Sequence, residues 1–311
     1  MWSNEYQPER HGYQVLLSMY NEESCLENCL LSLDESLKDK SWILLVGDDD
    51  STDNSLVELA RYVEAGRITA DKVHLYEYDK ASTVGEAKNR LIKEAHNFKE
   101  DYQSILFMDA DDDMLPERPN MIHTAVEKNS PFVVGAWEKN PFPFQPRINN
   151  AQYSVDTLRF GPWATLFDCN FLPEDGVFFP EHKIFNTGFE DLLLWYHLKY
   201  IKDIVPVAHS SKQVSLDDDT PVHRYRIRKE GGVDRVTASR PADKGSLNYN
   251  RNTFWGLSEL IKDHSRDIFK NPPSREEAEE AMENYINRKE YENSRSKSVD
   301  PQGPCQGCGQ N

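Results

Sequence analysis

The sequence predicts an α/β protein with a mainly parallel, Rossmann-like sheet, helices on both faces, and a helical appendage at the carboxyl terminus. Between about residues 13 and 137, short apolar runs alternate with amphipathic helical patterns. This alternation is typical of parallel strands joined by helices. Three of the apolar runs also end abruptly in polar residues. Carboxyl ends of parallel strands share one edge of a sheet, so these polar residues are expected to lie together.

Taken in order, the apolar runs and helical patterns of the first half define nine elements. The expected strands are 13–19, 42–46, 73–77, 104–108 and 131–137, and the expected helices are 23–36, 54–64, 84–97 and 117–129. A loop rich in aromatic residues and proline is expected across 138–160, then a helix at 191–200 and a strand near 204–208. Two further helices are expected at 252–264 and 274–294, followed by a polar and flexible tail.

Composition narrows the class of protein. The chain has 311 residues, 38% of them hydrophobic, and a net charge of −17. Such acidity disfavours a nucleic-acid-binding protein, although a nucleic acid as acceptor stays open. No uninterrupted apolar stretch is long enough for a transmembrane helix, and the five cysteines are odd in number. We therefore expect a soluble, cytoplasmic protein.

Four carboxylates within five positions form the first candidate site. Asp109, Asp111, Asp112 and Asp113 directly follow the apolar run 105–108. Clustered carboxylates repel one another unless a cation lies among them, and Mg²⁺ or Mn²⁺ binds carboxylate and phosphate oxygens together. The pattern therefore indicates a metal that holds a diphosphate. The alternative is a solvated acidic turn.

Two other strand ends strengthen the metal and diphosphate interpretation. The run 42–47 ends in Asp48, Asp49 and Asp50, and residues 51–53 can cap the following helix. Capping does not account for Asp48 and Asp49. The first strand ends similarly, in the polar stretch 20–23.

Read in order, these motifs resemble the family 2 glycosyltransferases, which have the GT-A fold. The resemblance spans roughly residues 13–230 and rests on seven stretches, namely 17–23, 48–53, 85–89, 107–112, 162–163, 179–181 and 190–191. Two positions depart from the family pattern. Asp50 replaces the usual Gly, which matters if φ is positive there, and Lys88 replaces the usual Arg, so the charge is kept but the bidentate fork is lost.

The resemblance implies a division of the chain. A GT-A domain is expected over 1–250, with a nucleotide-binding half at about 1–137 and an acceptor half at about 138–250. A helical appendage at 251–293 and a tail at 294–311 follow. The tail contains Cys305 and Cys308, which have the spacing of half a zinc knuckle or of a redox pair. We expect this tail to be unmetallated, or to form a knuckle completed by a neighbouring chain.

The resemblance also implies a nucleotide pocket, lined by Ser18, Tyr20, Glu22 and Asp49. A carboxylate at Asp49 that accepts a hydrogen bond from the base would favour uracil over cytosine. For Tyr20 the alternative is an ordinary half-buried aromatic residue. Lys88 is expected to meet the diphosphate, unless it is a solvated lysine on an amphipathic helix.

By the same resemblance, Asp111 binds the metal directly and Asp109 faces the ribose or the water molecules of the metal. His223 could complete the metal shell, although an isolated histidine is more often not a ligand. Asp112 and Asp113 are expected to be excess charge, with direct ligation of the metal as the alternative. The implied cofactor is Mn²⁺ or Mg²⁺.

The acceptor side follows from the later motifs. Asp191 is expected to be the catalytic base, with a helix N-cap as its alternative role, and Glu190 to bind the acceptor or act as a second candidate base. Trp163 fits a sugar-stacking platform or a core position. Arg226 and Arg228 could bind phosphate through bidentate bonds.

Together these assignments predict metal-dependent, inverting transfer of a sugar from a nucleotide diphosphate sugar, with a UDP-sugar favoured, to a hydroxyl acceptor. A sugar-1-phosphate nucleotidyltransferase is the second interpretation, but no Gly-rich phosphate loop occurs near the amino terminus. A non-catalytic sugar-nucleotide-binding module is the third. The loops at 138–160 and 170–188 are expected to select the acceptor.

Overall fold

The structure is a computed structural model, and it describes residues 12–140, 147–158, 160–182, 184, 190–209, 220–226, 247–262 and 267–298. Its strands are β1 Tyr13–Met19, β2 Trp42–Asp49, β3 Lys72–Tyr78, β4 Ser104–Asp109, β5 Asp113–Met114, β6 Phe132–Val134, β7 Trp137–Asn140, β8 Arg147–Asn149, β9 Thr165–Asp168, β10 Val207–Ala208 and β11 His223–Arg226. Its helices are α1 Leu26–Leu37, α2 Ser55–Glu64, α3 Val84–Ala95, α4 Met121–Glu127, α5 Ala151–Thr157, α6 Glu190–Tyr200, α7 Leu247–Lys262 and α8 Arg275–Ser298.

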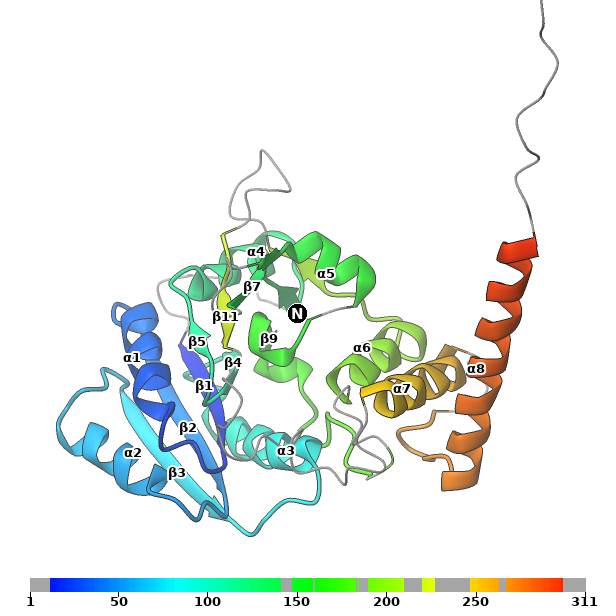
Figure 1. The fold of residues 1–311 in the computed structure, drawn as a ribbon. Helices are drawn as coiled ribbons and strands as arrows, with labels where there is room; N and C mark the ends of the chain where they lie inside the picture. The colour runs from blue at the N-terminus through cyan, green and yellow to red at the C-terminus, as the bar shows by residue number, and fades with distance from the viewer. Residues whose placement is uncertain are drawn as a thin grey trace, which may run out of the picture.

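The main sheet has seven strands in the order β10-β6-β9-β4-β1-β2-β3. Figure 1 shows β4, β1, β2 and β3 of this sheet next to one another. Strands β4, β1, β2 and β3 run parallel, and β9 runs antiparallel to both of its neighbours. The predicted α/β fold with a mainly parallel sheet is therefore confirmed. The register places Ser18 of β1 opposite Gly47 of β2 on one side and Asp109 of β4 on the other. As predicted, the polar strand ends meet at one edge.

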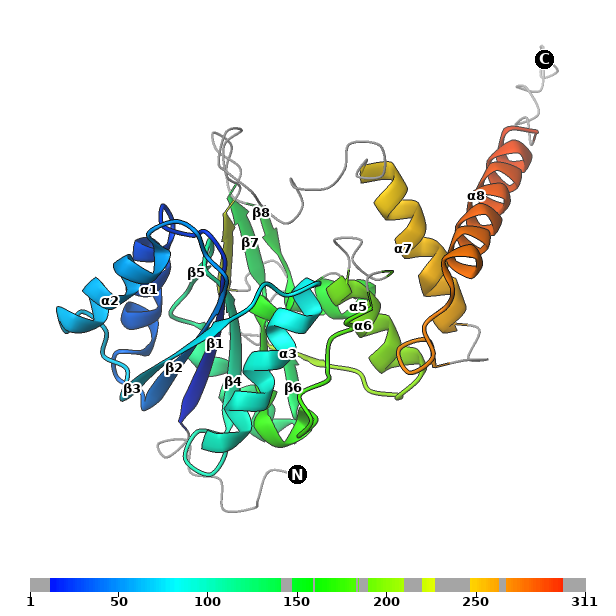
Figure 2. The same cartoon turned by 90° about the horizontal axis from the view of Figure 1, so that it is seen from below.

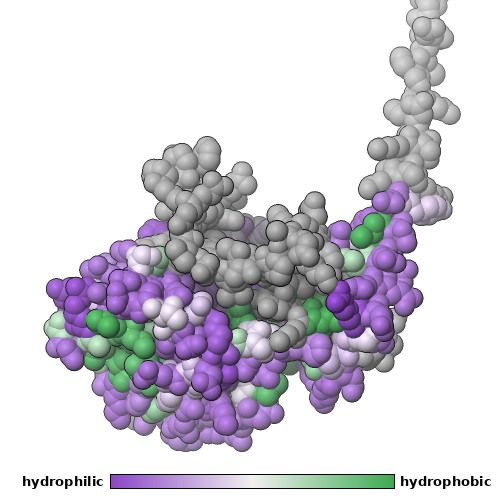
Figure 3. All heavy atoms as spheres, turned by 60° about the horizontal axis from the view of Figure 1, so that its bottom comes forward, coloured by the Kyte–Doolittle hydropathy of each residue, from purple (hydrophilic) through white to green (hydrophobic). Residues whose placement is uncertain are grey.

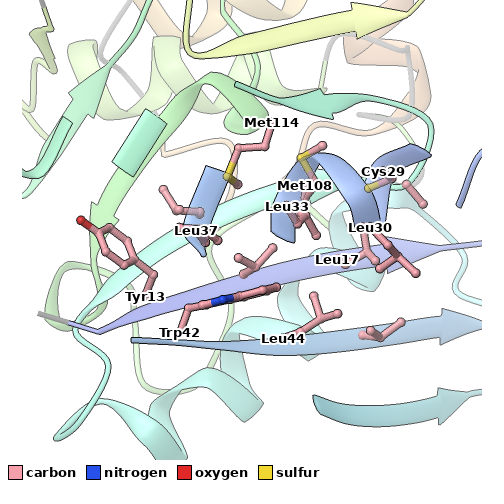
Figure 4. Packing of buried hydrophobic residues seen from close by; sticks show 14 of the residues in the cluster. Tyr13, Leu17, Cys29, Leu30, Leu33, Leu37, Trp42, Leu44, Met108 and Met114 are labelled. Atoms are coloured by element: carbon pink, nitrogen blue, oxygen red, sulfur yellow. The ribbon is translucent and has the colours of Figure 1, made fainter. Parts of the chain in front are cut away.

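Helices cover both faces of this sheet (Figure 2). On one face α1, α2 and α4 pack against alternate residues of β1 and β2, and on the other α3, α5 and α6 contribute to a second buried cluster. Figure 4 shows Leu30, Leu33 and Leu37 of α1 directed at Leu17 and Trp42 of the sheet, and these residues are at most 2% exposed. Burying each leucine stabilises the fold by roughly 1.5–3 kcal/mol, so these contacts hold the strand ends in place.

A second sheet, in the order β5-β11-β7-β8, lies beside the first. The prediction of one strand over 131–137 was wrong, because β6 ends at Val134 and β7 begins at Trp137 in the other sheet. Gly135 lies at the break. A Cβ atom there would be 2.4 Å from Cγ2 of Val222, so only glycine allows the segment entering β11 to pack this closely.

The prediction of a loop across 138–160 was also wrong in part. Strand β8 and helix α5 occupy 147–149 and 151–157. Asn150 caps the amino end of this helix, because its side-chain oxygen accepts a hydrogen bond from the backbone N–H of Tyr153 at 3.1 Å.

Helices α7 and α8 pack together next to α6 (Figure 1). A small apolar cluster joins them, with Leu193 of α6 against Phe254 and Leu257 of α7, and with Ala278 of α8. A domain boundary near residue 250 stays a prediction. The tail with Cys305 and Cys308 lies outside the described residues.

The face shown in Figure 3 is mainly hydrophilic where residues are described, with smaller apolar areas. This is the usual result of placing most apolar side chains in the interior. Among the described helices, none is both long and apolar enough to span a membrane.

Candidate active site

The site is built where the carboxyl ends of β1, β2 and β4 meet. Of the predicted nucleotide-binding residues, Ser18 lies near the end of β1 and Tyr20 directly follows that strand, while Asp49 ends β2 and Asp109 ends β4. The structure therefore brings these residues to one edge of the sheet, the position at which open α/β sheets bind ligands.

Hydrogen bonds tie the turns after β1 and β2 together. The side-chain oxygen of Asn21 accepts from the backbone N–H of Thr52 at 2.8 Å, and the backbone N–H of Glu22 donates to the hydroxyl of Ser55 at 2.7 Å. Asp50 has a φ of 66°, which confirms that the position of the usual glycine requires a positive φ. Asp adopts this conformation more readily than most residues.

A charged cluster surrounds Asp49. Its Oδ1 accepts from the backbone N–H of Ala81 at 2.6 Å and lies 3.7 Å from the Arg90 guanidinium, while its Oδ2 lies 3.2 Å from Nζ of Lys80. The Lys80 ammonium also lies 2.7 Å from the centre of the Tyr20 ring. One lysine therefore contacts both groups predicted to bind the base.

Lys88 and Asp109 form an ion pair at the same edge. Nζ of Lys88 lies 2.6 Å from Oδ1 of Asp109, and the lysine side chain is 8% exposed while the carboxylate is 32% exposed. The solvated position considered for Lys88 is not the one observed. A cation placed here can neutralise phosphate charge beside the β4 carboxylates.

Helix α3, which carries Lys88, is fixed to the segment 178–181. The side-chain amide of Asn89 donates to the Phe179 carbonyl and to Glu181, at 2.8 and 2.9 Å, and its oxygen accepts from the backbone N–H of Phe179 at 2.8 Å. A Cβ atom at Gly85 would be 2.3 Å from the Pro180 carbonyl oxygen. The stretches 85–89 and 179–181, both noted in the sequence, thus pack on each other.

A buried polar pair lies behind the acidic turn. Asp112 and His223 are both 0% exposed, and Oδ2 of Asp112 lies 3.0 Å from Nε2 of His223. The imidazole stacks on Trp163 with 4.5 Å between ring centres. Burial lowers the pKa of His223 well below its usual value, so the ring is neutral and donates to the carboxylate.

Arg118 lies fully buried beneath the same turn. Its guanidinium donates to the carbonyls of Phe107 and Thr165, at 2.6 and 3.1 Å. Burial lowers the pKa of Arg118 to about 9, while the charges of Asp109 and Asp112 act in the opposite direction. Asp112 thus compensates the buried charge of Arg118 and also accepts a hydrogen bond from the buried imidazole.

The remaining predicted residues are placed as follows. Asp111 lies in the turn between β4 and β5 and is partly exposed, and Asp191 lies in the first turn of α6, with its Oδ1 accepting from the backbone N–H of Leu192 at 2.8 Å. Trp163 is half-buried and meets Trp137 edge-on as well as His223. Glu190 begins α6 and Arg226 ends β11, but their side chains are not described, and Arg228 lies outside the described residues.

Sequence reasoning missed four residues of this region. Lys80 follows β3, so the rule that identified the other strand ends could have included it. Asn89 stood in a noted motif without a role. Arg90 and Arg118 carried no signal, because Asp49, which Arg90 faces, and Thr165, to which Arg118 donates, lie far away along the chain.

The carboxylates at the end of β4 are suitable ligands for a divalent cation such as Mg²⁺ or Mn²⁺, which binds oxygen donors. Asp109 and Asp111 supply hard oxygen donors beside the buried cation of Lys88. Within the described part of the chain, no three His, Cys, Asp or Glu side chains surround a common metal position. An Mg²⁺ site can consist of one or two carboxylates together with substrate phosphates, so it does not need three protein side chains.

Comparisons with known proteins agree with this geometry. The family model described as "Glycosyl transferase family 2" matches residues 14–173. The S. aureus TarS 1–349 structure in complex with UDP-GlcNAc is similar, with a TM-score of 0.57 and 16% identity over 93% of this chain and 76% of that one. The mannosyltransferase PcManGT from Pyrobaculum calidifontis, in complex with GDP-Man and Mn2+, has a TM-score of 0.55 and 15% identity over 91% and 75%. No curated protein sequence matches significantly.

Proposed function

Because the chain belongs to glycosyl transferase family 2 and is a glycosyltransferase, we propose that it transfers a sugar from a nucleotide diphosphate donor to a hydroxyl acceptor with inversion at the anomeric carbon. One observation carries the proposal. Asp49 at the end of β2 and the Lys88–Asp109 pair at the end of β4 converge at one edge, where they suit the base and the diphosphate of one ligand.

The reaction needs a proton acceptor on the acceptor side. The acceptor hydroxyl attacks the anomeric carbon, the bond from that carbon to the diphosphate oxygen breaks, and Asp191 takes the hydroxyl proton. Attack in line with the leaving diphosphate inverts the centre. Asp191 suits this role because it is partly exposed in the first turn of α6, where backbone N–H groups favour the ionised carboxylate.

Asp111, with Asp109, would hold Mn²⁺ or Mg²⁺, and such a metal supplies a positive charge that stabilises the departing diphosphate. Lys88 contributes a second cation from the α3 side. His223 was a third candidate ligand. Its Nε2 is taken by Asp112 in a fully buried pair, which makes it a support of the acidic turn in this proposal.

The nucleobase of the donor and the identity of the acceptor are the finer parts of the proposal. The two similar structures contain UDP-GlcNAc and GDP-Man, so the fold accepts more than one nucleotide. A uridine donor is favoured here because Asp49 offers a carboxylate to the ring N–H, which cytosine lacks. The acceptor is proposed to bind on the side of α6 and of the segments 138–160 and 170–188.

Slow hydrolysis of the donor, in which water replaces the acceptor, tests whether Asp191 is the catalytic base. The acceptor need not be known for this test. UDP-sugars would be incubated with Mn²⁺ and the wild-type protein, Asp191→Asn, or Asp39→Asn, a control carboxylate exposed after α1. We expect Asp191→Asn to bind the donor normally and to lose hydrolysis by at least about 100-fold, within the range of general base catalysis. Hydrolysis at the wild-type rate would show that Asp191 is not the base.

A further inference from the structure

The two oxygens of the Asp49 carboxylate have different surroundings. Oδ1 is held by the backbone N–H of Ala81 at 2.6 Å and faces Arg90 at 3.7 Å. Oδ2 faces only a flexible cation among the described residues, Nζ of Lys80 at 3.2 Å, and that side chain is 42% exposed. One oxygen is therefore fixed by the protein, and the other shares the Lys80 ammonium with the Tyr20 ring.

Arg90 is itself anchored on three sides. Its Nη2 lies 2.7 Å from Glu86, its Nη1 donates to the Asp79 carbonyl at 2.6 Å, and its guanidinium lies 5.2 Å from the centre of the Tyr78 ring. Glu86 in turn accepts hydrogen bonds from the backbone and the hydroxyl of Ser82 at 2.8 and 2.7 Å. A side chain held in this way can set the orientation of a neighbouring carboxylate.

We infer that Arg90 is a positioning residue that determines base specificity, because it holds Asp49 with a single oxygen available to the nucleobase. The inference rests on the proposed function, which places the base beside Asp49 and Tyr20. It assigns a uridine nucleotide as the donor class and excludes guanosine nucleotides as good donors.

Uracil and guanine present different hydrogen-bonding edges to a carboxylate. Uracil carries one ring N–H between two carbonyl groups, so it needs one carboxylate oxygen with donors beside it, and Lys80 can donate to the adjacent carbonyl. Guanine presents a ring N–H next to an exocyclic amino group, which together call for both oxygens of a carboxylate. Oδ1 has two acceptor positions and is already engaged by the N–H of Ala81 and faced by Arg90, so a guanine amino group would have to displace one of these groups. The hydrogen bond from Ala81 to the Asp49 carboxylate is charge-assisted, and such bonds are the stronger class.

Titration calorimetry with UDP and GDP in the presence of Mn²⁺ tests the inference. The proteins would be the wild type, Arg90→Gln, Arg90→Lys and the control Arg61→Gln, whose arginine pairs with Glu58 on the surface of α2. We expect the wild type and Arg61→Gln to bind UDP at least about tenfold more tightly than GDP, a difference of about 1.4 kcal/mol. Arg90→Gln should reduce this ratio at least about fivefold, and Arg90→Lys, which keeps the charge, should restore most of it.

The outcomes separate the two claims. If the wild type prefers UDP and Arg90→Gln keeps the same ratio, Arg90 does not position Asp49 and the inference fails while the proposed function stands. A wild type that prefers GDP overturns the inference in the same way. If the wild type binds neither nucleotide, the proposed function fails and the inference falls with it. Should Arg90→Gln not fold, Arg90→Met, which also removes the charge, takes its place: a UDP-to-GDP ratio reduced toward unity supports the inference, and an unchanged ratio overturns it.

Discussion

Asp112→Ala should lower the free energy of unfolding by about 2–4 kcal/mol, although the sequence suggested that Asp112 was excess charge. The carboxylate is 0% exposed and accepts from His223, also 0% exposed, at 3.0 Å. A hydrogen bond to a charged group contributes about 1.5–3 kcal/mol, and a buried donor left without its acceptor costs about 1–3 kcal/mol. These two effects overlap, and the buried charge of Arg118 also loses a compensating carboxylate.

Urea unfolding, followed by circular dichroism, would measure this loss. Asp112→Asn keeps an oxygen that accepts from the imidazole, so it should cost no more than about half as much as the alanine substitution. Asp39→Ala, at an exposed carboxylate, should change stability by less than about 0.5 kcal/mol. A cost below about 1 kcal/mol for Asp112→Ala, or equal costs for alanine and asparagine, would refute the reasoning that this pair supports the acidic turn.

Three further predictions concern single positions. Gly85→Ala should destabilise the protein by about 1–3 kcal/mol in thermal unfolding, because the new Cβ would be 2.3 Å from the Pro180 carbonyl oxygen, and an unchanged melting temperature would show that α3 is not held against this segment. Asp50→Gly should raise stability by up to about 1 kcal/mol, since φ is 66° there, and a loss of stability would contradict the strain argument. Burial lowers the pKa of His197 from 6.5 to about 4, so the unfolded state binds more protons between these values and stability falls as the pH drops through this window. The free energy of unfolding, measured with urea, should therefore fall between pH 7 and pH 5 by about 2 kcal/mol more in the wild type than in His197→Phe. Equal falls in the two proteins would contradict a lowered pKa of His197.

The strands that position the site could be predicted from the sequence because their apolar runs are continuous. The prediction for β1 matched the observed strand, and that for β4 fell one residue short. The placement of Asp49 and Asp109 at one edge followed from parallel pairing alone. Asp50 could be identified as a position of positive φ, because a family resemblance places glycine there.

Other features depend on contacts that no local pattern reveals. Strand β5 has two residues, which is too short for an alternating pattern. The burial of Asp112 depends on His223, which lies 111 positions away in the sequence. The break at Gly135 depends on Val222 in the same way. Tertiary contacts, not local propensity, decide these features.

The most direct test of the central claim is calorimetric binding of UDP-sugars to the wild type and to Asp111→Ala, each with Mn²⁺ and with chelator. If the β4 carboxylates hold a metal and the donor diphosphate together, the wild type should bind a UDP-sugar when Mn²⁺ is present and should not bind it with chelator. Asp111→Ala should bind that UDP-sugar at least about tenfold more weakly, a difference of about 1.4 kcal/mol. Asp39→Ala should bind as the wild type does. Equal binding with Mn²⁺ and with chelator, or unchanged binding by Asp111→Ala, would contradict the claim that this edge is a metal-dependent donor site.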